Sequence, residues 1–301
     1  MGFFCLCMSP AVDATVAVDC EPKNGAVMKN VRDLENAGGK GLNVARYLAT
    51  RGAEVACGGL LGKDNAAVFE SELSRYGIAD AFVRVPGPTR RNEMIVWPGG
   101  GFKLNRAAFP NLAELPPLHA FFQGYENDAD AVFVLSGSLP PCCPKDFYAR
   151  CVRLLRQRGA TVVLDASGEA LRCAAAAHPS MIKPNADECA DLVGFVPRTP
   201  DEFRRATAEM QLFAPEVIIS DGASGAWFNG EFCPAPKVGV VDTTAAGDTL
   251  LAEWCWRRFA EKSGSAAQWA VAAGSAACTL PGGQPPPAEL VERLYRTDCP
   301  C

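Results

Sequence analysis

The sequence lacks three features that would place the protein in other classes. No apolar run approaches the roughly 18 residues of a membrane-spanning helix, and no Cys-x-x-Cys pair of a zinc or redox site occurs. Basic residues are not in excess, since 29 Lys and Arg against 34 Asp and Glu give a net charge of −5. A nucleic-acid-binding domain usually has a basic surface instead. We therefore expect neither a membrane span nor a nucleic-acid partner.

Histidine is scarce, and cysteine does not reach the level of a disulfide scaffold. The two histidines, His119 and His178, lie outside every motif, so we expect no chemistry from an imidazole. The 14 cysteines in 301 residues fall below the roughly 8–10% typical of disulfide scaffolds. Residues 1–8 contain no basic residue that would begin a secretory signal. These observations favour a cytoplasmic protein with buried free thiols.

What is present is typical of a globular α/β protein. Hydrophobic residues make up 49% of the chain, which excludes a disordered protein. Apolar runs alternate with helical patterns, and this order predicts parallel strands joined by helices that cover both faces of a sheet. We expect strands at 2–8, 55–57, 131–135, 161–164, 181–182 and 217–219. We expect helices within 36–51, 65–76 and 145–158, and after Asp248 and Ser263.

Two segments, at about 12–34 and 85–105, interrupt this alternation. Both are half polar and contain turn signals such as Gly87-Pro88 and Gly99-Gly100-Gly101. The sequence shows no internal repeat and no linker between domains. We therefore predict a single α/β domain over residues 1–301, with a small separate sheet formed by the two insertions.

Polar residues or glycine follow most of the predicted strands. Because ligands bind beyond the carboxyl ends of the strands in an open parallel sheet, these residues predict a polar crevice. Its hydrogen-bond donors and carboxylates suit a polar, anionic ligand. The residues at these strand ends are Ser136, Gly137, Ser138, Asp165, Lys183, Asn185, Ser220, Asp221, Gly222 and Asp242.

The segment 240–252 combines an apolar strand end, a run of small residues and the start of an apolar helix. Small residues let backbone N–H groups approach a ligand closely, and a helix N-terminus favours an anion. Asp248 stands at the rim of this predicted anion hole, where a carboxylate would repel a stored phosphate. It suits a base that takes a proton from an attacking hydroxyl during phosphoryl transfer. The alternative is that Asp248 only caps the helix.

A second glycine-rich segment, Gly38-Gly39-Lys40-Gly41-Leu42-Asn43, allows two interpretations. It is not a Walker A loop, because no Gly-Lys pair in the chain is followed by Ser or Thr. As a dinucleotide fingerprint it lacks the third glycine and a strand directly before it, so a nicotinamide-dependent oxidoreductase is the weaker interpretation. Glycines beside Lys40 and Asn43 instead suit a hydroxylated or phosphorylated small molecule.

Three motifs, taken in this order, resemble the ribokinase-like carbohydrate kinases of the phosphofructokinase-B (pfkB) type along nearly the whole chain. They are the segments 37–46 and 242–249, with the Asn185-x-x-Glu188 element between them. The resemblance implies a three-layer α/β/α sandwich with a mainly parallel central sheet, and a small β-sheet lid formed by the two insertions. It also implies transfer of a phosphoryl group from ATP, with Mg²⁺, to an alcohol, and it assigns Asp248 as the base.

Further pieces are similar to the 1-phosphofructokinase branch of this family, at 60–65, 89–92, 136–141, 182–185 and 272–277. That similarity implies phosphorylation of fructose 1-phosphate at its 6-hydroxyl, to give fructose 1,6-bisphosphate. Arg90 favours a phosphorylated acceptor, because a guanidinium fork suits a fixed phosphate. The chain departs from the branch at Ser9-Pro10, where Asn-Pro is usual, at Ala245-Ala246, where Gly-Ala is usual, and at Cys142-Cys143.

The resemblance also implies a role for each site residue. The backbone N–H groups of Ala245, Ala246 and Gly247 would hold the transferring phosphoryl group. The acceptor would contact Asp13, Gly38, Gly39, Lys40, Asn43, Arg90, Asn92 and Ser138, with Lys40, Arg90 and Ser138 at its far phosphate. ATP would contact Lys183, Asn185, Ser220, Gly222, Gly225, Gly247, Gly274 and Ala277. Glu188 would orient water around Mg²⁺, and Asp242 would help to bind a monovalent cation such as K⁺.

Other acceptors and one other class of function stay open. Within the family, the chain could be a tagatose-6-phosphate kinase, a 6-phosphofructokinase, or a kinase of an unphosphorylated sugar or nucleoside. A non-catalytic sugar-phosphate sensor with the same pocket is disfavoured, because both Asp248 and Glu188 are present. The lid further implies a homodimer, since lids of this family often pair two subunits.

Overall fold

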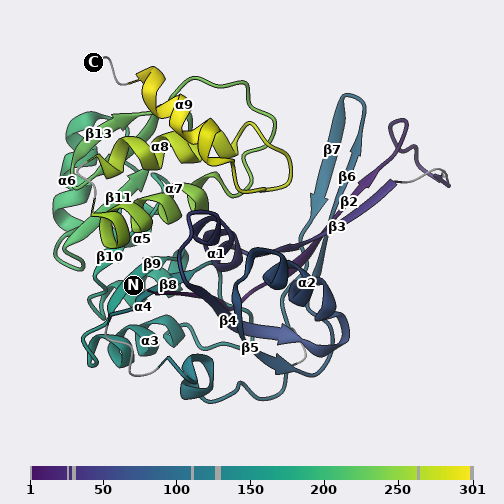
Figure 1. The fold of residues 1–301 in the computed structure, drawn as a ribbon, viewed down its shortest axis with the longest axis horizontal. Coiled ribbons are helices and arrows are strands. Elements are labelled where there is room, and N and C mark those ends of the chain that lie inside the picture. Colours follow the sequence, from purple (N-terminus) through teal and green to yellow (C-terminus); the bar gives the residue numbers. More distant parts are fainter. Residues whose placement is uncertain are drawn as a thin grey trace.

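The computed structural model describes residues 2–25, 27–28, 32–109, 112–125, 130–262 and 265–298. These residues form a body built on a large sheet, and a second, smaller sheet that stands away from the body (Figure 1). None of the described helices is both long enough and apolar enough to cross a lipid bilayer.

Nine strands form the large sheet. Their bounds are β1 Phe3–Cys7, β4 Val55–Gly62, β5 Ala79–Val85, β8 Val132–Ser136, β9 Thr161–Asp165, β10 Met181–Ile182, β11 Glu216–Ser220, β12 Gly225–Phe228 and β13 Glu231–Pro234. Their order across the sheet is β13-β12-β11-β10-β9-β8-β1-β4-β5. The strands from β11 to β5 run parallel, and β12 and β13 add an antiparallel hairpin at one edge.

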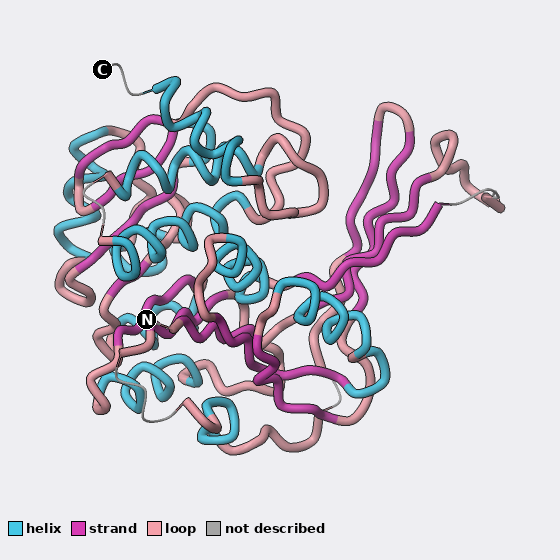
Figure 2. Tube along the Cα trace, viewed as in Figure 1, coloured by secondary structure: helices cyan, strands magenta, loops and turns pink. Residues whose placement is uncertain are grey.

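Helices cover both faces of this sheet (Figure 2). One face carries α1 Lys40–Thr50, α2 Ala67–Tyr76, α7 Ala246–Cys255, α8 Ala266–Ala277 and α9 Ala288–Asp298. The other carries α3 Phe147–Arg156, α4 Gly168–Ala175, α5 Cys189–Val193 and α6 Pro200–Met210. Short helical turns complete the chain at η1 Lys63–Asn65, η2 Leu118–Phe122, η3 Gly222–Ser224 and η4 Trp256–Glu261. The predicted three-layer α/β/α architecture is confirmed.

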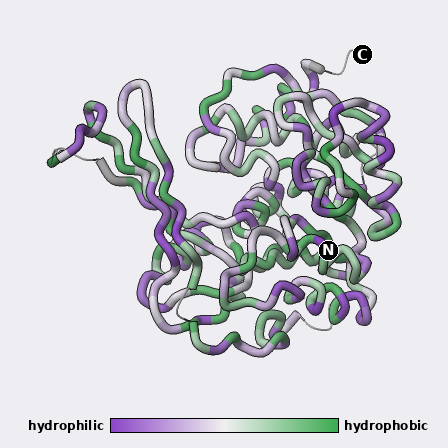
Figure 3. The backbone as a smooth tube through the Cα atoms, turned by 180° about the vertical axis from the view of Figure 1, so that it is seen from behind, coloured by the Kyte–Doolittle hydropathy of each residue, from purple (hydrophilic) through white to green (hydrophobic). Residues whose placement is uncertain are grey.

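The strand β1 lies in the middle of the body because all of its residues are apolar. Phe3 and Cys5 pack into the core on the face of α1, whereas Phe4 and Leu6 pack into the core on the opposite face. A parallel strand that is buried on both faces is expected to be such a continuous apolar run. In Figure 3 the strands at the centre of the body are coloured hydrophobic, and the base of the smaller sheet is coloured hydrophilic.

The two insertions form the smaller sheet, from β2 Ala11–Ala17, β3 Arg32–Gly38, β6 Arg91–Trp97 and β7 Gly100–Leu104. Its order is β3-β2-β6-β7, with β2 and β6 parallel and the outer pairs antiparallel. The structure extends the first insertion, predicted to end at about residue 34, because β3 continues through residue 38; α1, at 40–50, lies within the predicted range 36–51. Residues 26 and 29–31 of the first insertion lie outside the described residues.

The strand order creates a crevice at the carboxyl ends of the strands of the large sheet. From β1 the chain continues to β4 and β5 on one side, and it then returns to β8 and β9 on the other. At such a reversal the connections diverge and leave a crevice beyond the carboxyl ends of the neighbouring strands. The smaller sheet starts beside these carboxyl ends, because only residues 8–10 separate the end of β1 from the start of β2.

Candidate active site

A cavity of about 510 Å³ occupies this crevice, between the body and the base of the smaller sheet. Strand ends, the first turns of α1 and α7, and the smaller sheet all contribute to its walls. The predicted site residues that line it are Asp13, Gly39, Lys40, Asn43, Arg90, Asn92, Ser138, Lys183, Asn185, Glu188, Ser220, Ala245, Ala246, Gly247 and Asp248. Folding therefore brings the three sequence motifs to one place.

Two glycines allow α1 to begin close against β1. Gly39 has a φ of 131°, and a Cβ at this position would lie 2.6 Å from Cys7 Sγ. A Cβ on Gly41 would lie 2.7 Å from the carbonyl oxygen of Leu6. Because neither position has room for a side chain, only glycine allows the first turn of α1 to pack directly against the carboxyl end of β1. Lys40 and Asn43 reach the cavity as a result.

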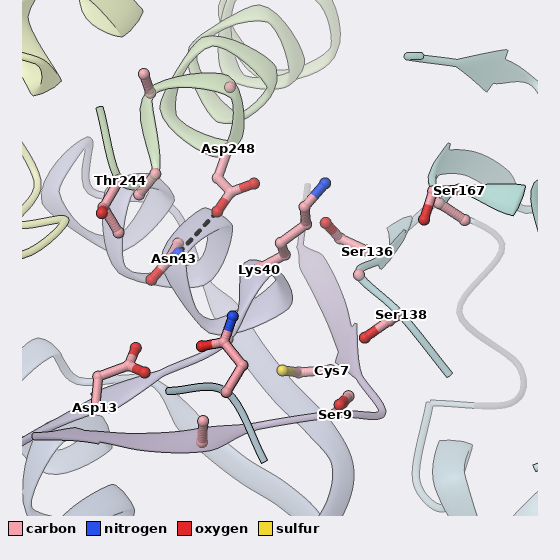
Figure 4. Close-up of a pocket in the computed structure, with 18 of the residues that line it drawn as sticks. Cys7, Ser9, Asp13, Lys40, Asn43, Ser136, Ser138, Ser167, Thr244 and Asp248 are labelled. Atoms are coloured by element: carbon pink, nitrogen blue, oxygen red, sulfur yellow. Dashed lines mark hydrogen bonds between the residues drawn. The ribbon is translucent and has the colours of Figure 1, made fainter. Parts of the chain in front are cut away.

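Asp248, in the first turn of α7, is only 5% exposed. Its Oδ2 accepts a hydrogen bond of 2.7 Å from Asn43 Nδ2, and its other carboxylate oxygen points into the cavity (Figure 4). Within the described residues this is its only side-chain hydrogen bond, so Asp248 does not cap α7. Burial, reinforced by the negative charge of Asp165, raises the pKa of Asp248 to about 6. A carboxyl group with this pKa can accept a proton near neutral pH.

The start of α7 offers open backbone donors to an anion. Ala245 has a φ of 62°, a left-handed conformation that is uncommon for a residue with a side chain. The N–H groups of Ala245 and Gly247 have no partner in the described part of the chain, whereas Ala246 N–H donates to Thr243 O at 3.3 Å. Lys183 Nζ lies 3.8 Å from the place that a Cβ on Gly247 would occupy. Amides, helix terminus and ammonium group together attract negative charge to this point.

A buried carboxylate, Asp165 at the end of β9, holds two lysines at the site. Its Oδ1 lies 3.1 Å from Lys183 Nζ and 3.5 Å from Lys40 Nζ, and Ser136 Oγ donates to its Oδ2 at 3.1 Å. Burial alone would raise the pKa of Asp165, but the two ammonium groups outweigh burial and hold it below the usual value. Asp165 in turn raises the pKa of Lys40. Lys40 therefore stays positively charged at the cavity wall.

Asp13 and Asn92 face the cavity as a pair from the smaller sheet. They lie opposite each other in β2 and β6, and Asn92 Nδ2 donates to Asp13 Oδ1 at 2.8 Å. Residues that are paired across two strands point to the same face of a sheet. The pair thus presents a carboxylate and an amide to a ligand with several hydroxyl groups.

Arg90 connects the base of the smaller sheet to the body. Its guanidinium donates to the carbonyl oxygens of Ser9 at 3.0 Å, Pro10 at 3.2 Å and Arg106 at 3.0 Å. A guanidinium has five N–H donors, so these contacts leave two donors for a ligand. Arg90 therefore combines a structural contact with a position on the cavity wall.

Asn185 and Glu188 bind each other in a reciprocal pair. Asn185 N–H donates to Glu188 Oε2 and Glu188 N–H donates to Asn185 Oδ1, both at 2.8 Å. Among the described residues, no group of three or more His, Cys, Asp or Glu side chains could enclose a metal ion. A divalent cation beside Glu188 would thus depend on ligand phosphates and water, which is how Mg²⁺ is usually bound.

Two predicted site residues, Gly38 and Asp242, line a neighbouring cavity of about 100 Å³ instead. The Asp242 carboxylate joins two loops. Its Oδ1 accepts from the N–H and the hydroxyl of Thr244 at 2.8 and 2.7 Å, and its Oδ2 accepts from Gly282 N–H at 2.9 Å. These bonds outweigh burial and lower the pKa of Asp242. Its contact with a monovalent cation stays a prediction.

Four further predicted residues, Gly222, Gly225, Gly274 and Ala277, lie outside the walls of both cavities. Gly274 lets α8 pack closely on α7, since a Cβ there would lie 3.1 Å from Ala246 O. Gly225 lies where a Cβ would be 2.1 Å from Cys233 O, and Ala277 is buried. Gly225, Gly274 and Ala277 therefore have packing roles, whereas Gly222 is exposed with nothing within 4 Å of a Cβ. Contact with ATP stays a prediction for all four.

Some cavity residues are not identified by the sequence analysis. Asp165 is recognised there only as a polar strand end, not as the partner of two lysines. Lys103 and Asn105 line the cavity from the smaller sheet, and Cys7 lines it from β1. Lys103 lies opposite Met94 in β6, and therefore on the same face as Asn92. The alternation of strand residues could have indicated that face, but no motif marks Lys103.

Residues 8–289 match the profile of the pfkB family carbohydrate kinases. The chain belongs to this family. It is therefore a phosphotransferase with an alcohol group as acceptor. The match includes all three motifs that carry the resemblance in the sequence.

Similar proteins agree with this membership. The 1-phosphofructokinase of Vibrio cholerae serotype O1 is 34% identical over 258 residues, which cover 83% of this chain and 80% of the relative. The tagatose-6-phosphate kinase of Staphylococcus epidermidis is 30% identical over 256 residues, which cover 82% of each chain. The structure of phosphofructokinase-2 from Escherichia coli in complex with potassium has a TM-score of 0.86 and 25% identity over 98% of both chains. The predicted ribokinase-like fold is confirmed.

Proposed function

We propose that this pfkB kinase transfers the terminal phosphoryl group of ATP to the 6-hydroxyl of fructose 1-phosphate, giving fructose 1,6-bisphosphate and ADP. One observation carries the proposal. The nearly buried Asp248 carboxylate points into the cavity beside the open amides of α7. The same cavity contains hydroxyl-binding groups and Arg90, which suit a phosphorylated sugar. The similarity to 1-phosphofructokinases supports this acceptor.

The proposed reaction begins at the free oxygen of Asp248. This oxygen takes the proton of the 6-hydroxyl as the sugar oxygen attacks the terminal phosphorus of ATP. The new bond joins the sugar oxygen to phosphorus, and the bond from phosphorus to the bridging oxygen of ADP breaks. The hydrogen bond from Asn43 keeps the other oxygen of Asp248 occupied and so fixes the direction of the carboxylate.

Negative charge on the transferring group would be stabilised by the amides of Ala245 and Gly247, and by Lys183. In phosphoryl transfer a protein contributes mainly positioning and electrostatic stabilisation. Because Lys183 is 4% exposed, its charge is little screened by solvent. The Ala246 amide would join only if its weak bond to Thr243 opens.

The acceptor would lie against Asp13, Asn92 and the glycine-rich start of α1. We assign its 1-phosphate to Lys40 and Ser138, with the two remaining donors of Arg90. Lys40 is already held at the cavity by Asp165, so it would lose little conformational freedom on binding.

Lys183, Asn185 and Ser220 line the part of the cavity that we assign to ATP. Mg²⁺ would neutralise charge on the ATP phosphates, and Glu188 would bind it through water. We also assign Asp242 to a monovalent-cation site, because its carboxylate joins two loops beside the cavity. A homodimer through the smaller sheet is supported by exposed apolar side chains on that sheet, at Leu34, Met94, Phe102 and Leu104.

An acceptor panel tests the proposal. Purified protein with MgATP is offered fructose 1-phosphate, fructose 6-phosphate, tagatose 6-phosphate, ribose and adenosine, and ADP release is measured by a coupled assay. We expect the highest kcat/KM with fructose 1-phosphate. A preference for tagatose 6-phosphate or fructose 6-phosphate would correct the assignment of the acceptor. If none of the five acceptors causes ADP release, the proposal is contradicted.

A further inference from the structure

A row of side chains connects the Asp248 carboxylate to α2 on the outside of the body. Asn43 Nδ2 donates to Asp248 Oδ2 at 2.7 Å, and Arg46 Nη2 donates to Asn43 Oδ1. Arg46 Nη1 in turn donates to Glu72 Oε1 at 2.8 Å. Arg46 is 5% exposed and lies one turn after Asn43 on α1. The row therefore runs from the cavity through a buried arginine to a carboxylate on a neighbouring helix.

The two ends of the Asn43 amide are chemically different, and Arg46 distinguishes between them. A guanidinium has only donors, so it can bind the amide oxygen but not the amide nitrogen. With its oxygen held by Arg46, Asn43 must turn its NH₂ group toward Asp248. A reversed amide would place its oxygen against the Asp248 carboxylate and its NH₂ group against the guanidinium. Both contacts would then be unfavourable, and a proton on Asp248 would relieve only the first of them.

We propose that Arg46 is a positioning residue, which holds the Asn43 amide so that Asp248 stays ionised and turned toward the acceptor. Glu72 is the anchor of this arrangement, because it binds the second nitrogen of the guanidinium. The proposal rests on the proposed function, which makes Asp248 the base. Arg46 itself is assigned to neither the acceptor nor the nucleotide.

Other charges also act on Asp248, and they do not depend on Arg46. Asp165 at the end of β9 opposes ionisation, whereas Lys40 on α1 and Lys183 after β10 favour it. Cys7 on β1 also faces this region, but burial raises the pKa of its thiol to about 11. Because burial already raises the pKa of Asp248, the Asn43 donor is one of the few groups that counteract it. Loss of its orientation should therefore raise that pKa further.

Three substitutions of Arg46 test the proposal. Met removes every donor, Gln can meet Asn43 with either end of its amide, and Lys keeps a donor-only group that can still bind the amide oxygen. Arg75→Met is the matched control, because Arg75 also faces Glu72, at 3.9 Å, but is exposed and does not touch Asn43. Thermal unfolding shows which variants are folded.

For each folded variant, kcat/KM for fructose 1-phosphate is measured from pH 5 to 9. We expect the acidic limb to move upward by about one pH unit in Arg46→Met and Arg46→Gln. It should stay in place in Arg46→Lys and in Arg75→Met. A uniform loss of activity at every pH, with the limb unmoved, would show that Arg46 only supports the fold and would overturn the proposal.

A second measurement needs no turnover. In nitrogen-15 NMR spectra, the side-chain NH₂ signals of Asn43 should shift with the same midpoint as the Asp248 carboxyl carbon. Asp248→Asn serves to assign that carbon signal. Asn43 signals that do not respond between pH 4 and 8 would overturn the proposal. If the wild type phosphorylates no acceptor, the proposed function fails, and the same titration in Arg46→Met still decides whether Arg46 orients the amide. An Asn43 response that is unchanged in this variant would overturn the proposal.

Discussion

Asn43 on α1 donates a 2.7 Å hydrogen bond to Asp248 on α7, although 205 positions separate the two residues in the chain. The bond joins the glycine-rich motif to the last motif of the sequence. It is formed at the cavity wall, where the acceptor would contact Asn43. In the proposed reaction, binding of the sugar and removal of its proton would therefore depend on the same pair of helices.

The pH dependence of the reaction should follow the ionisation of Asp248. Burial and Asp165 raise its pKa to about 6, so the carboxyl is protonated and inactive as a base below that pH. We expect kcat/KM to fall about tenfold per pH unit below pH 6 and to be level above pH 7. A pH–rate profile between pH 4.5 and 8.5 measures this. An acidic limb near pH 4 would mean that Asp248 is not the titrating base.

Asp165→Asn should destabilise the fold, because it leaves Lys183 buried without its partner. Removing one partner of a buried ion pair costs about 3–5 kcal/mol. Asp187→Asn is the control, since its pair with Arg198 is at 3.8 Å and exposed, and it should change stability by less than about 1 kcal/mol. Urea unfolding at pH 7 measures both variants. Equal stabilities would contradict the account of the lysine pair.

The same interaction fixes the direction of a pH effect on stability. The folded-state pKa of Asp165 is below its unfolded value, so the folded protein binds its proton more weakly. Its contribution to stability is thus fully present above the unfolded pKa and is lost as the pH falls through the folded pKa. The wild type should lose more stability than Asp165→Asn when the pH is lowered from 6 to 3.

Arg90→Ala should raise the KM for the sugar phosphate at least about tenfold and change kcat little, because a fixed phosphate is bound alike in ground and transition states. The variant also loses three bonds to backbone carbonyls at the base of the smaller sheet. Arg91→Ala is the control, since Arg91 pairs with Glu35 on the other face of that sheet. An unchanged KM in Arg90→Ala would point to an acceptor without a phosphate.

Gly39→Ala should destabilise the start of α1. The methyl group would lie 2.6 Å from Cys7 Sγ and 3.2 Å from Pro10 Cα, at a φ of 131°. We expect a loss of about 2 kcal/mol or more in urea unfolding, from strain and overlap together. Gly52→Ala has a φ of 79° with nothing within 4 Å, so it should cost only about 1 kcal/mol. Similar losses in both variants would contradict the close approach of α1 to β1.

The buried parallel strands are the elements that the sequence predicts best. β10 has the predicted bounds, β9 differs by one residue at one end, and β1 and β11 differ by one residue at each end, because each is an apolar run with a polar end. The β12–β13 hairpin is not identified, although Asn229-Gly230, both with positive φ, is a strong hairpin signal. The start of α6 is not predicted either, although the sequence carries a signal for it in the capping box of Thr199 and Glu202.

The candidate site also contains some residues that the sequence predicts and some contacts that it does not. Asp248, Asn43 and Lys183 stand in motifs, so the sequence places them together. The ion pair of Asp165 with Lys183 depends on the register of β9 and β10 and on the depth of burial, which no short segment specifies. Lys103 reaches the cavity only because the smaller sheet stands over the strand ends. Such contacts between distant segments require the folded structure.

The most direct test of the central claim compares the wild type with Asp248→Asn, using fructose 1-phosphate and MgATP. Asparagine keeps the shape and an oxygen that can accept the Asn43 hydrogen bond, but it cannot take the proton of the attacking hydroxyl. We expect kcat to fall at least about 10²-fold, with substrate binding and the melting temperature at pH 7 maintained. An Asp248→Asn variant that releases ADP at the wild-type rate would contradict the assignment of Asp248 as the base.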